Sequence, residues 1–161
     1  MELIKTEAAR RAIAIAVRVD EVKDIRDKAE AVRLYVKRAG LGREMENDAA
    51  EIVIWADRRI GELLERMKET GQRQKRGGNR KSKSQIATLI SPTLEELGIK
   101  KQEASEVSML ANIPEKELTQ YIAEARADGG VRPSSARKMA RMANQNKRKK
   151  NPPPFKPQAF N

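Results

Sequence analysis

The stretch from about residue 44 to residue 70 constrains the fold most, because its apolar side chains recur at helical spacing on more than one side. One stripe follows near-heptad steps and comprises Met45, Ala49, Ile52, Ala56, Ile60, Leu63 and Met67. Val53, Leu64 and the ring of Trp55 widen the apolar arc beyond that stripe. At 1.5 Å per residue this helix is roughly 40 Å long. A helix with so wide an apolar surface needs more than one neighbour to cover it.

The rest of the chain before Asn144 also has helical character, which predicts an all-α fold. Ala, Leu, Ile, Glu, Lys and Arg dominate, and no useful length alternates with the period of two that marks a strand. The predicted helices cover residues 6–18, 20–39, 44–70, 115–127 and 134–143, with a further helix after Ile99. A short Gly-containing connection between the second and third makes them an antiparallel hairpin.

The surplus apolar face of the long helix leaves two alternatives. Either the first predicted helix covers it within a monomer, or a second subunit covers it in a homo-oligomer. We favour the homo-oligomer, with the helical hairpin as the oligomerisation region. The candidate interface residues are Ile52, Val53, Trp55, Ile60 and Leu64.

Charge changes abruptly along the chain. Residues 1–70 hold 15 basic and 15 acidic side chains, whereas residues 71–90 hold six basic and none acidic. Residues 91–130 hold four basic against eight acidic, and residues 131–161 hold nine basic and none acidic. The predicted organisation is a helical hairpin at 1–70, a basic flexible linker at 71–83, a small helical domain at 84–143 and a disordered basic, Pro-rich tail at 144–161.

The two purely basic segments are the main indication of a partner. Lys and Arg side chains that displace phosphate counterions supply most sequence-independent affinity for nucleic acid. A net charge of +11 concentrated in this way favours nucleic acid as a partner, with double-stranded DNA as the leading candidate, over basic segments that only keep a small protein soluble. The candidate phosphate-binding residues are Arg73, Lys75, Arg76, Arg80, Lys81, Lys83, Arg137, Lys138, Arg141, Lys147, Arg148, Lys149 and Lys150.

Residues 93–111 follow the sequence outline of a helix-turn-helix. Thr93 and Glu96 form a capping box for a short helix, Gly98 breaks the pattern, Ile99 is apolar, and a second helix follows. A plain helical bundle is the alternative interpretation, since two glutamates of the second helix would repel phosphates unless they face cytosine or solvent. If this helix reads the major groove, its base-reading candidates are Lys101, Gln102, Ser105 and Ser108.

Several functional classes are excluded or disfavoured by composition. The chain has no His and no Cys, which excludes zinc fingers, His-based acid–base chemistry, Cys nucleophiles and disulfides. One Trp, two Tyr and two Phe are too few for the usual base-stacking sheets and barrels. No glycine run has the spacing of a phosphate loop. We therefore expect a protein that is not an enzyme and holds no cofactor and no metal.

The apolar runs are also too short to span a membrane, and the first residues open no secretory signal. We expect a cytoplasmic protein of a bacterial host cell, with no membrane partner. The prolines after Lys150 favour an extended tail, in which Phe155 and Phe160 are candidate anchors for a protein partner. The alternative is that these two rings have no partner.

Three sequence segments carry a resemblance to a known group of proteins. They are Val19-Asp-Glu-Val-Lys-Asp-Ile-Arg-Asp-Lys-Ala-Glu-Ala-Val-Arg, Ala49-Ala-Glu-Ile and Arg58-Arg-Ile-Gly-Glu-Leu-Leu, followed more loosely by Leu97-Gly-Ile-Lys-Lys-Gln-Glu-Ala-Ser, Leu110-Ala and Ile113-Pro-Glu. Over roughly residues 19–143 the chain resembles widespread phage and prophage helical proteins, mostly without assigned function. The resemblance implies a helical N-terminal region, a helix-turn-helix-like C-terminal half and a link to DNA. It implies no catalytic residues, and Ala104-Ser105 stands where that group has a serine pair.

The leading hypothesis is a non-enzymatic phage or prophage DNA-binding protein that acts in regulation, replication or packaging. A second hypothesis is an adaptor or inhibitor of a host or phage protein, which would bind through the hairpin and the Phe-bearing tail. A third is an RNA-binding regulator that uses the Arg- and Lys-rich segments alone. The three hypotheses differ in whether duplex DNA, a protein or RNA is the partner of the basic segments.

Overall fold

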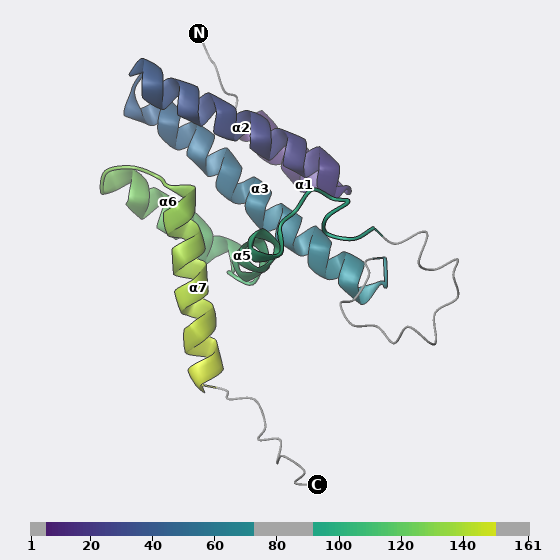
Figure 1. Ribbon diagram of the computed structural model, residues 1–161. Coiled ribbons are helices and arrows are strands. Elements are labelled where there is room, and N and C mark those ends of the chain that lie inside the picture. The colour runs from purple at the N-terminus through teal and green to yellow at the C-terminus, as the bar shows by residue number, and fades with distance from the viewer. Residues whose placement is uncertain (1–5, 73–91, 151–161) are drawn as a thin grey trace, which may run out of the picture.

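The computed structural model describes residues 6–72 and 92–150, and these residues form six helices and no strand (Figure 1). The helices are α1 (Thr6–Ile15), α2 (Val19–Ala39), α3 (Arg43–Glu69), α5 (Lys101–Ala111), α6 (Glu115–Ala127) and α7 (Pro133–Lys150). The predicted all-α class is therefore confirmed for the described part of the chain. None of the described helices is long and apolar enough to cross a bilayer.

The helices α2 and α3 lie side by side and run in opposite directions (Figure 1). α2 ends at Ala39 and is followed by Gly40, whose φ of 64° is left-handed, and the N–H of Leu41 donates to the carbonyl oxygen of Val36 at 3.1 Å. This is a Schellman-type helix end, a conformation that glycine adopts without strain from a Cβ atom. The Gly-containing connection therefore reverses the chain within three residues.

The helix α3 is the centre of the fold, because α1, α2, α5 and α7 all contact it. Residues 52–56 are buried in succession, so neighbours cover every side of this helix. The prediction of an oligomer interface here was wrong, since its five candidate residues are at most 7% exposed within one chain; they are Ile52, Val53, Trp55, Ile60 and Leu64. The physical reason is that α5, from the second half of the chain, packs on α3 beside the hairpin.

The two halves of the described chain share one hydrophobic cluster. Its buried members come from α1, α2 and α3 before the linker and from α5, α6 and α7 after it. The segments 1–70 and 84–143, which were predicted as separate folded units, therefore do not have separate cores. A short chain gains from this arrangement, because a single larger core buries a greater fraction of its apolar surface.

Gly61 is a point of close approach between α3 and α5. A Cβ atom added to Gly61 would lie 2.1 Å from the carbonyl oxygen of Val107 and 2.9 Å from the Cβ atom of Ala111. Only a residue without a side chain permits this distance between the two helices. The glycine in the Arg-Arg-Ile-Gly segment thus has a packing role, and it sets the position of α5.

The segment before α5 differs from the predicted first helix of a helix-turn-helix. The capping box is present: the N–H of Thr93 donates to Glu96 Oε2 at 2.6 Å, and the N–H of Glu96 donates to Thr93 Oγ1 at 3.2 Å. However, residues 94–98 form only a turn, which ends at Gly98 with a φ of 65°. Proline before the cap and glycine after it leave room for a single turn between them.

The last described helix extends further than the sequence predicted. We expected helix to Ala143 and disorder from Asn144, but α7 continues to Lys150. Gln, Lys and Arg are adequate helix formers, and the first proline after them is Pro152, so nothing ends the helix earlier. The tail candidates Phe155 and Phe160 lie outside the described residues.

Candidate nucleic-acid interface

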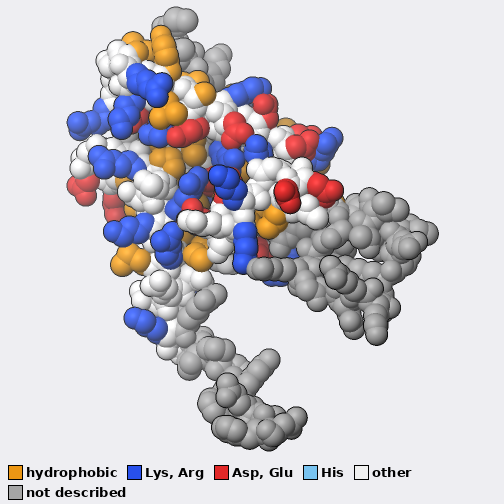
Figure 2. Space-filling view, viewed as in Figure 1, with side chains coloured by type: hydrophobic (Ala, Val, Ile, Leu, Met, Phe, Trp, Pro, Cys, Tyr) orange, Lys and Arg blue, Asp and Glu red, His pale blue; other side chains and the backbone are white. Residues whose placement is uncertain are grey.

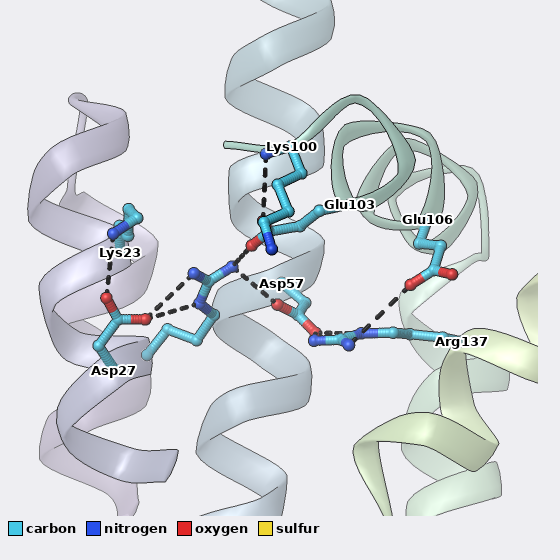
Figure 3. A network of polar contacts seen from close by, with 8 residues as sticks. Lys23, Asp27, Asp57, Lys100, Glu103, Glu106 and Arg137 are labelled. Carbon is cyan, nitrogen blue, oxygen red and sulfur yellow. Dashed lines mark hydrogen bonds and ion pairs between the residues drawn. The ribbon is translucent and has the colours of Figure 1, made fainter. Parts of the chain in front are cut away.

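A buried ion network holds α5 and α7 on the helical hairpin, and its members come from four helices (Figure 3). At its centre is Asp57 of α3, which is 0% exposed. Arg137 of α7 donates from Nε and Nη2 to Asp57 Oδ2 at 2.9 and 2.7 Å. Arg26 of α2 lies on the other side, with its Nη1 atom 3.6 Å from Asp57 Oδ1. This carboxylate therefore links three helices.

Arg26 connects the same network to α5. Its Nη1 atom donates to Glu103, and its Nε and Nη2 atoms each donate to Asp27 at 3.1 Å. Glu103 in turn accepts the backbone N–H of Lys100 at 3.4 Å, at the start of α5. Burial opposes the charge of Arg26, but the hydrogen bond and attraction from Glu103 and Asp57 overcome it and raise the pKa of this guanidinium. The start of α5 is thus fixed by charge as well as by packing.

The pKa of Asp57 is raised above its ordinary value. Burial is the largest cause, and it outweighs the attraction and hydrogen bonds from Arg137 and the attraction from Arg26, which act in the opposite direction. Asp57 Oδ1 has no hydrogen-bond partner among the described residues, although Arg26 lies near it. Full removal from water explains this direction, because desolvation disfavours the charged form of a carboxyl group.

Glu106 marks the boundary between this network and the outer surface of α5 and α7. Its Oε1 atom accepts from Gln102 Nε2 at 3.2 Å and from Arg141 Nη2 at 2.9 Å. Its Oε2 atom lies 4.0 Å from Arg137 Nη1. The fold therefore brings a predicted base-reading side chain, Gln102, and a predicted phosphate-binding side chain, Arg141, to the same carboxylate.

The base-reading candidates share the outer face of α5. Lys101, Gln102 and Ser105 are exposed, and Ser108 is half-buried. Asn112 follows the C-terminal end of α5, and its Nδ2 atom donates to the carbonyl oxygen of Ser108 at 2.9 Å. Of these four side chains, Gln102 is the one linked to α7, because Glu106 accepts from both Gln102 and Arg141.

The cations of α7 fall into two groups. Arg137 and Arg141 bond to carboxylates, so the prediction that both freely bind phosphate needs correction: a buried aspartate and a half-buried glutamate already engage them. Lys147 Nζ donates to the carbonyl oxygen of Asn112 at 3.5 Å, a long contact. Three exposed lysines have no polar partner among the described residues, namely Lys138, Lys149 and Lys150.

Other phosphate-binding candidates cannot be placed on this surface. Arg73, Lys75, Arg76, Arg80, Lys81 and Lys83 lie outside the described residues. The backbone of Arg148 belongs to α7, but its side chain is outside the described part. The candidate surface within the described residues therefore consists of the outer face of α5 and the cations of α7.

The second half of α7 extends away from the other helices toward the C-terminal end (Figure 1). Figure 2 shows that acidic and basic side chains are mixed over the helical body on the face in view, so this face has no uniform positive patch. Among the described helices, α7 is the one without an acidic residue, and it has seven basic residues.

Sequence reasoning missed Asp57 and Arg26, the residues that fix this geometry. A signal for Asp57 was present, because it interrupts the apolar stretch between Ile52 and Ile60 at a position that the long helix buries. A charge at such a position requires a partner. The partner came from α7, 80 residues later in the chain.

The arrangement offers amide, hydroxyl and cationic groups on one surface, which suits contact with a polyanion. The described residues contain no group of three or more acidic, His or Cys side chains placed to hold a metal ion. No protein-family model, no curated protein and no solved structure matches the chain. The proposed function therefore rests on the geometry and the charge distribution of the described residues.

Proposed function

We propose that this chain is a non-enzymatic phage or prophage DNA-binding protein that contacts the duplex through α7 and the outer face of α5. The observation that carries the proposal is the second half of α7, a purely basic helix end that extends from the folded body (Figure 1). A helix segment with no apolar face gains little from packing. Its lysines are well suited to neutralise backbone phosphates.

The first half of α7 supports this role by fixing the direction of the helix. Arg137 is held by the buried Asp57, and α7 also packs against α5. At 18 residues, α7 is about 27 Å long. A single turn of B-DNA is about 34 Å long, so the helix end can reach several phosphates from one anchored position.

The outer face of α5 is the element that we propose reads bases. Gln102 can bond adenine through its amide, and Ser105 can bond bases or phosphates. In the free protein the Gln102 amide is bonded to Glu106, so reading would require it to exchange this partner. Phosphate contacts from α7 would then set the position, and α5 would discriminate between sequences.

The contribution of α7 is tested by the double variant Lys149→Gln/Lys150→Gln. We expect weaker binding to all duplex sequences and a slope of log K against log salt that is smaller by about 0.9 for each phosphate that the variant no longer neutralises. The matched control is Lys37→Gln/Lys116→Gln, which removes the same charge from exposed residues of α2 and α6. Equal slopes for the two double variants would overturn the role of α7.

The contribution of α5 is tested by selecting bound sequences from random duplex DNA and then comparing Gln102→Ala with the control Gln120→Ala. Gln120 makes the same kind of bond on α6, from its Nε2 atom to Glu124 at 2.9 Å. We expect only Gln102→Ala to weaken the selected sequence by about 1–3 kcal/mol while non-specific binding stays unchanged. Tighter binding to RNA than to duplex DNA would favour the RNA-binding alternative.

A further inference from the structure

A cleft of about 540 Å³ lies between α1, α3 and the start of α6, away from the proposed DNA surface. Its apolar lining comes from Ile13, Ala14 and Trp55, and guanidinium groups surround this lining. Arg10 lies over the Trp55 ring, 4.7 Å from its centroid. The volume falls within the usual range for small-molecule sites, which combine apolar walls with a few placed polar groups.

Arg58 in this cleft has an unsatisfied donor. Its Nη1 atom donates to Glu62, but its buried Nε atom has no hydrogen-bond partner among the described residues. Its Nη2 atom, on the same edge of the guanidinium as Nε, likewise has no polar partner there. A buried donor without an acceptor is rare and indicates a missing partner.

Other arginines of the molecule show what this edge normally binds. Arg26, Arg33 and Arg137 each use Nε and Nη2 together on a carboxylate, and Arg59 uses the same pair on the carbonyl oxygen of Ala16. The side-on fork of guanidinium matches a carboxylate in shape and charge. The Nε–Nη2 edge of Arg58 lacks such an acceptor among the described residues, and a carboxylate is the acceptor that most of these arginines use.

The charge around the cleft favours a single negative charge in the ligand. The lining contains four arginines and three glutamates, which leaves one positive charge in excess; they are Arg10, Arg11, Arg58, Arg59, Glu7, Glu62 and Glu115. Arg11 is exposed and makes no ion pair within the described residues. It stands beside the cleft as a second cation for the same anion.

We propose that this cleft binds a small organic carboxylate whose apolar part packs on Ile13 and Trp55. The carboxylate bonds the Nε–Nη2 edge of Arg58 after a small rotation of that long side chain, which is 19% exposed. Arg11 adds attraction from the rim. This site is independent of the proposed DNA binding, since none of its residues belongs to α5 or α7.

The test uses Trp55 as its reporter, because it is the only tryptophan in the chain. Benzoate is titrated into the full-length protein while Trp fluorescence is recorded, with benzamide as the uncharged probe of the same shape and inorganic phosphate as the anion without an apolar part. We expect saturable quenching by benzoate with a dissociation constant on the order of 1 mM. Benzamide and phosphate should bind at least tenfold more weakly.

Variants then locate the anion. Arg58→Lys keeps the charge but removes the fork, and it should weaken benzoate binding at least fivefold; the exposed Arg11→Ala should weaken it two- to threefold. Arg66→Lys, on the exposed face of α3 outside the cleft, is the matched control and should bind as the unmodified protein does. Circular dichroism verifies the fold of each variant.

Three results would overturn the proposal. They are the absence of saturable benzoate quenching, equal binding of benzoate and benzamide, and tighter binding of phosphate than of benzoate. Unchanged affinity in both Arg11→Ala and Arg58→Lys would also overturn it. If Arg58→Lys fails to fold, Arg11→Ala still tests the site, because an exposed and unpaired side chain is not needed for folding.

Discussion

The two halves of α7 both carry only basic charge, but the first half uses its arginines inside the fold whereas the second half exposes its lysines. In the first half, Arg137 and Arg141 are bonded to Asp57 and Glu106, and alanines from this half are buried in the core. In the second half, Lys149 and Lys150 are exposed and have no polar partner among the described residues. The charged residues of both halves are all basic, so the sequence alone does not separate them.

The difference teaches that the number of cations in a helix is not the number available to a ligand. A guanidinium that already neutralises a buried carboxylate cannot bind phosphate without leaving that carboxylate unpaired, which is strongly unfavourable. A lysine at the exposed end has no such penalty. Four predictions test how far the first half of α7, which we call the anchored half, differs from the second half, which we call the free half.

The largest effect is expected from Asp57→Ala, which removes the carboxylate that anchors the first half. Arg137 and Arg26 would lose their shared acceptor inside the protein, so we expect the free energy of unfolding to fall by about 3–5 kcal/mol in urea titrations. Asp57→Asn should lose less than half as much. It retains an oxygen acceptor, and the raised pKa of Asp57 indicates that burial already disfavours the charge.

The control for this prediction is Lys138→Gln, on the adjacent residue of α7. Lys138 is exposed, and we expect a change within about 0.5 kcal/mol. If Asp57→Ala were as stable as this control, the first half of α7 would not depend on the buried aspartate, and the comparison between the two halves would fail.

The next effect is expected from Gly61→Ala, which acts on the anchored half through α5. The new Cβ atom would lie 2.1 Å from a backbone oxygen of α5, so the two helices must separate. We expect a loss of about 1–3 kcal/mol in the free energy of unfolding. Glu69→Ala, on an exposed position of α3, should leave the free energy of unfolding almost unchanged. Equal stability of the two variants would contradict the close approach at Gly61.

The helical class and several helix limits were predictable from the sequence, because local signals determine them. The predicted helix at 115–127 coincides with α6, and the capping box at Thr93 is present. Proline, glycine and cap residues act over a few positions, so they can be identified without a structure. The length of α7 was underestimated because a polar helix end has no apolar periodicity to mark it.

The packing was not predictable in the same way. Whether α5 or a second subunit covers α3 depends on contacts between residues more than 40 positions apart, such as Gly61 and Val107. The pairing of Arg137 with Asp57 is also long-range. Both charges are visible in the sequence, but the spacing between them gives no information that they meet.

A smaller effect on stability, with a gain in DNA affinity, is expected from Glu106→Gln. This change releases Arg141, which is 50% exposed, and removes a negative charge next to Gln102. Stability should fall by no more than about 1 kcal/mol, since the pair with Arg141 is largely open to solvent. Removal of one repulsive charge should tighten DNA binding about two- to fivefold in a binding titration.

The matched control for that variant is Glu117→Gln, an exposed position of α6 that gives the same change in net charge. If both variants bind DNA equally well, the gain comes from overall charge, and Glu106 does not restrain the interface. If Glu106→Gln binds more weakly than the unmodified protein, the carboxylate itself takes part in recognition, for example by accepting from cytosine.

The smallest effect concerns pH and again depends on the anchor of α7. The folded-state pKa of Asp57 lies above its ordinary value of 3.8. Between these two pKa values, the folded chain binds more protons at this group than the unfolded chain does. The contribution of Asp57 to stability is therefore fully present below pH 3.8 and is lost as pH rises through the raised pKa. Asp57→Asn has no such group, so the free energy of unfolding of the unmodified protein minus that of Asp57→Asn should decrease as pH rises.

Urea titrations of both proteins between about pH 4 and pH 7 measure this difference. Asp27 and Glu96, whose pKa values are lowered, lose their stabilising contributions as pH falls. Both proteins retain these two groups, so their contributions cancel in the difference to a first approximation. A difference that increases with pH would mean that the two arginines stabilise the Asp57 carboxylate by more than burial destabilises it. Net electrostatic attraction would then hold the anchored half of α7 in place. The two halves of α7 would differ more in electrostatic stabilisation than the raised pKa of Asp57 implies.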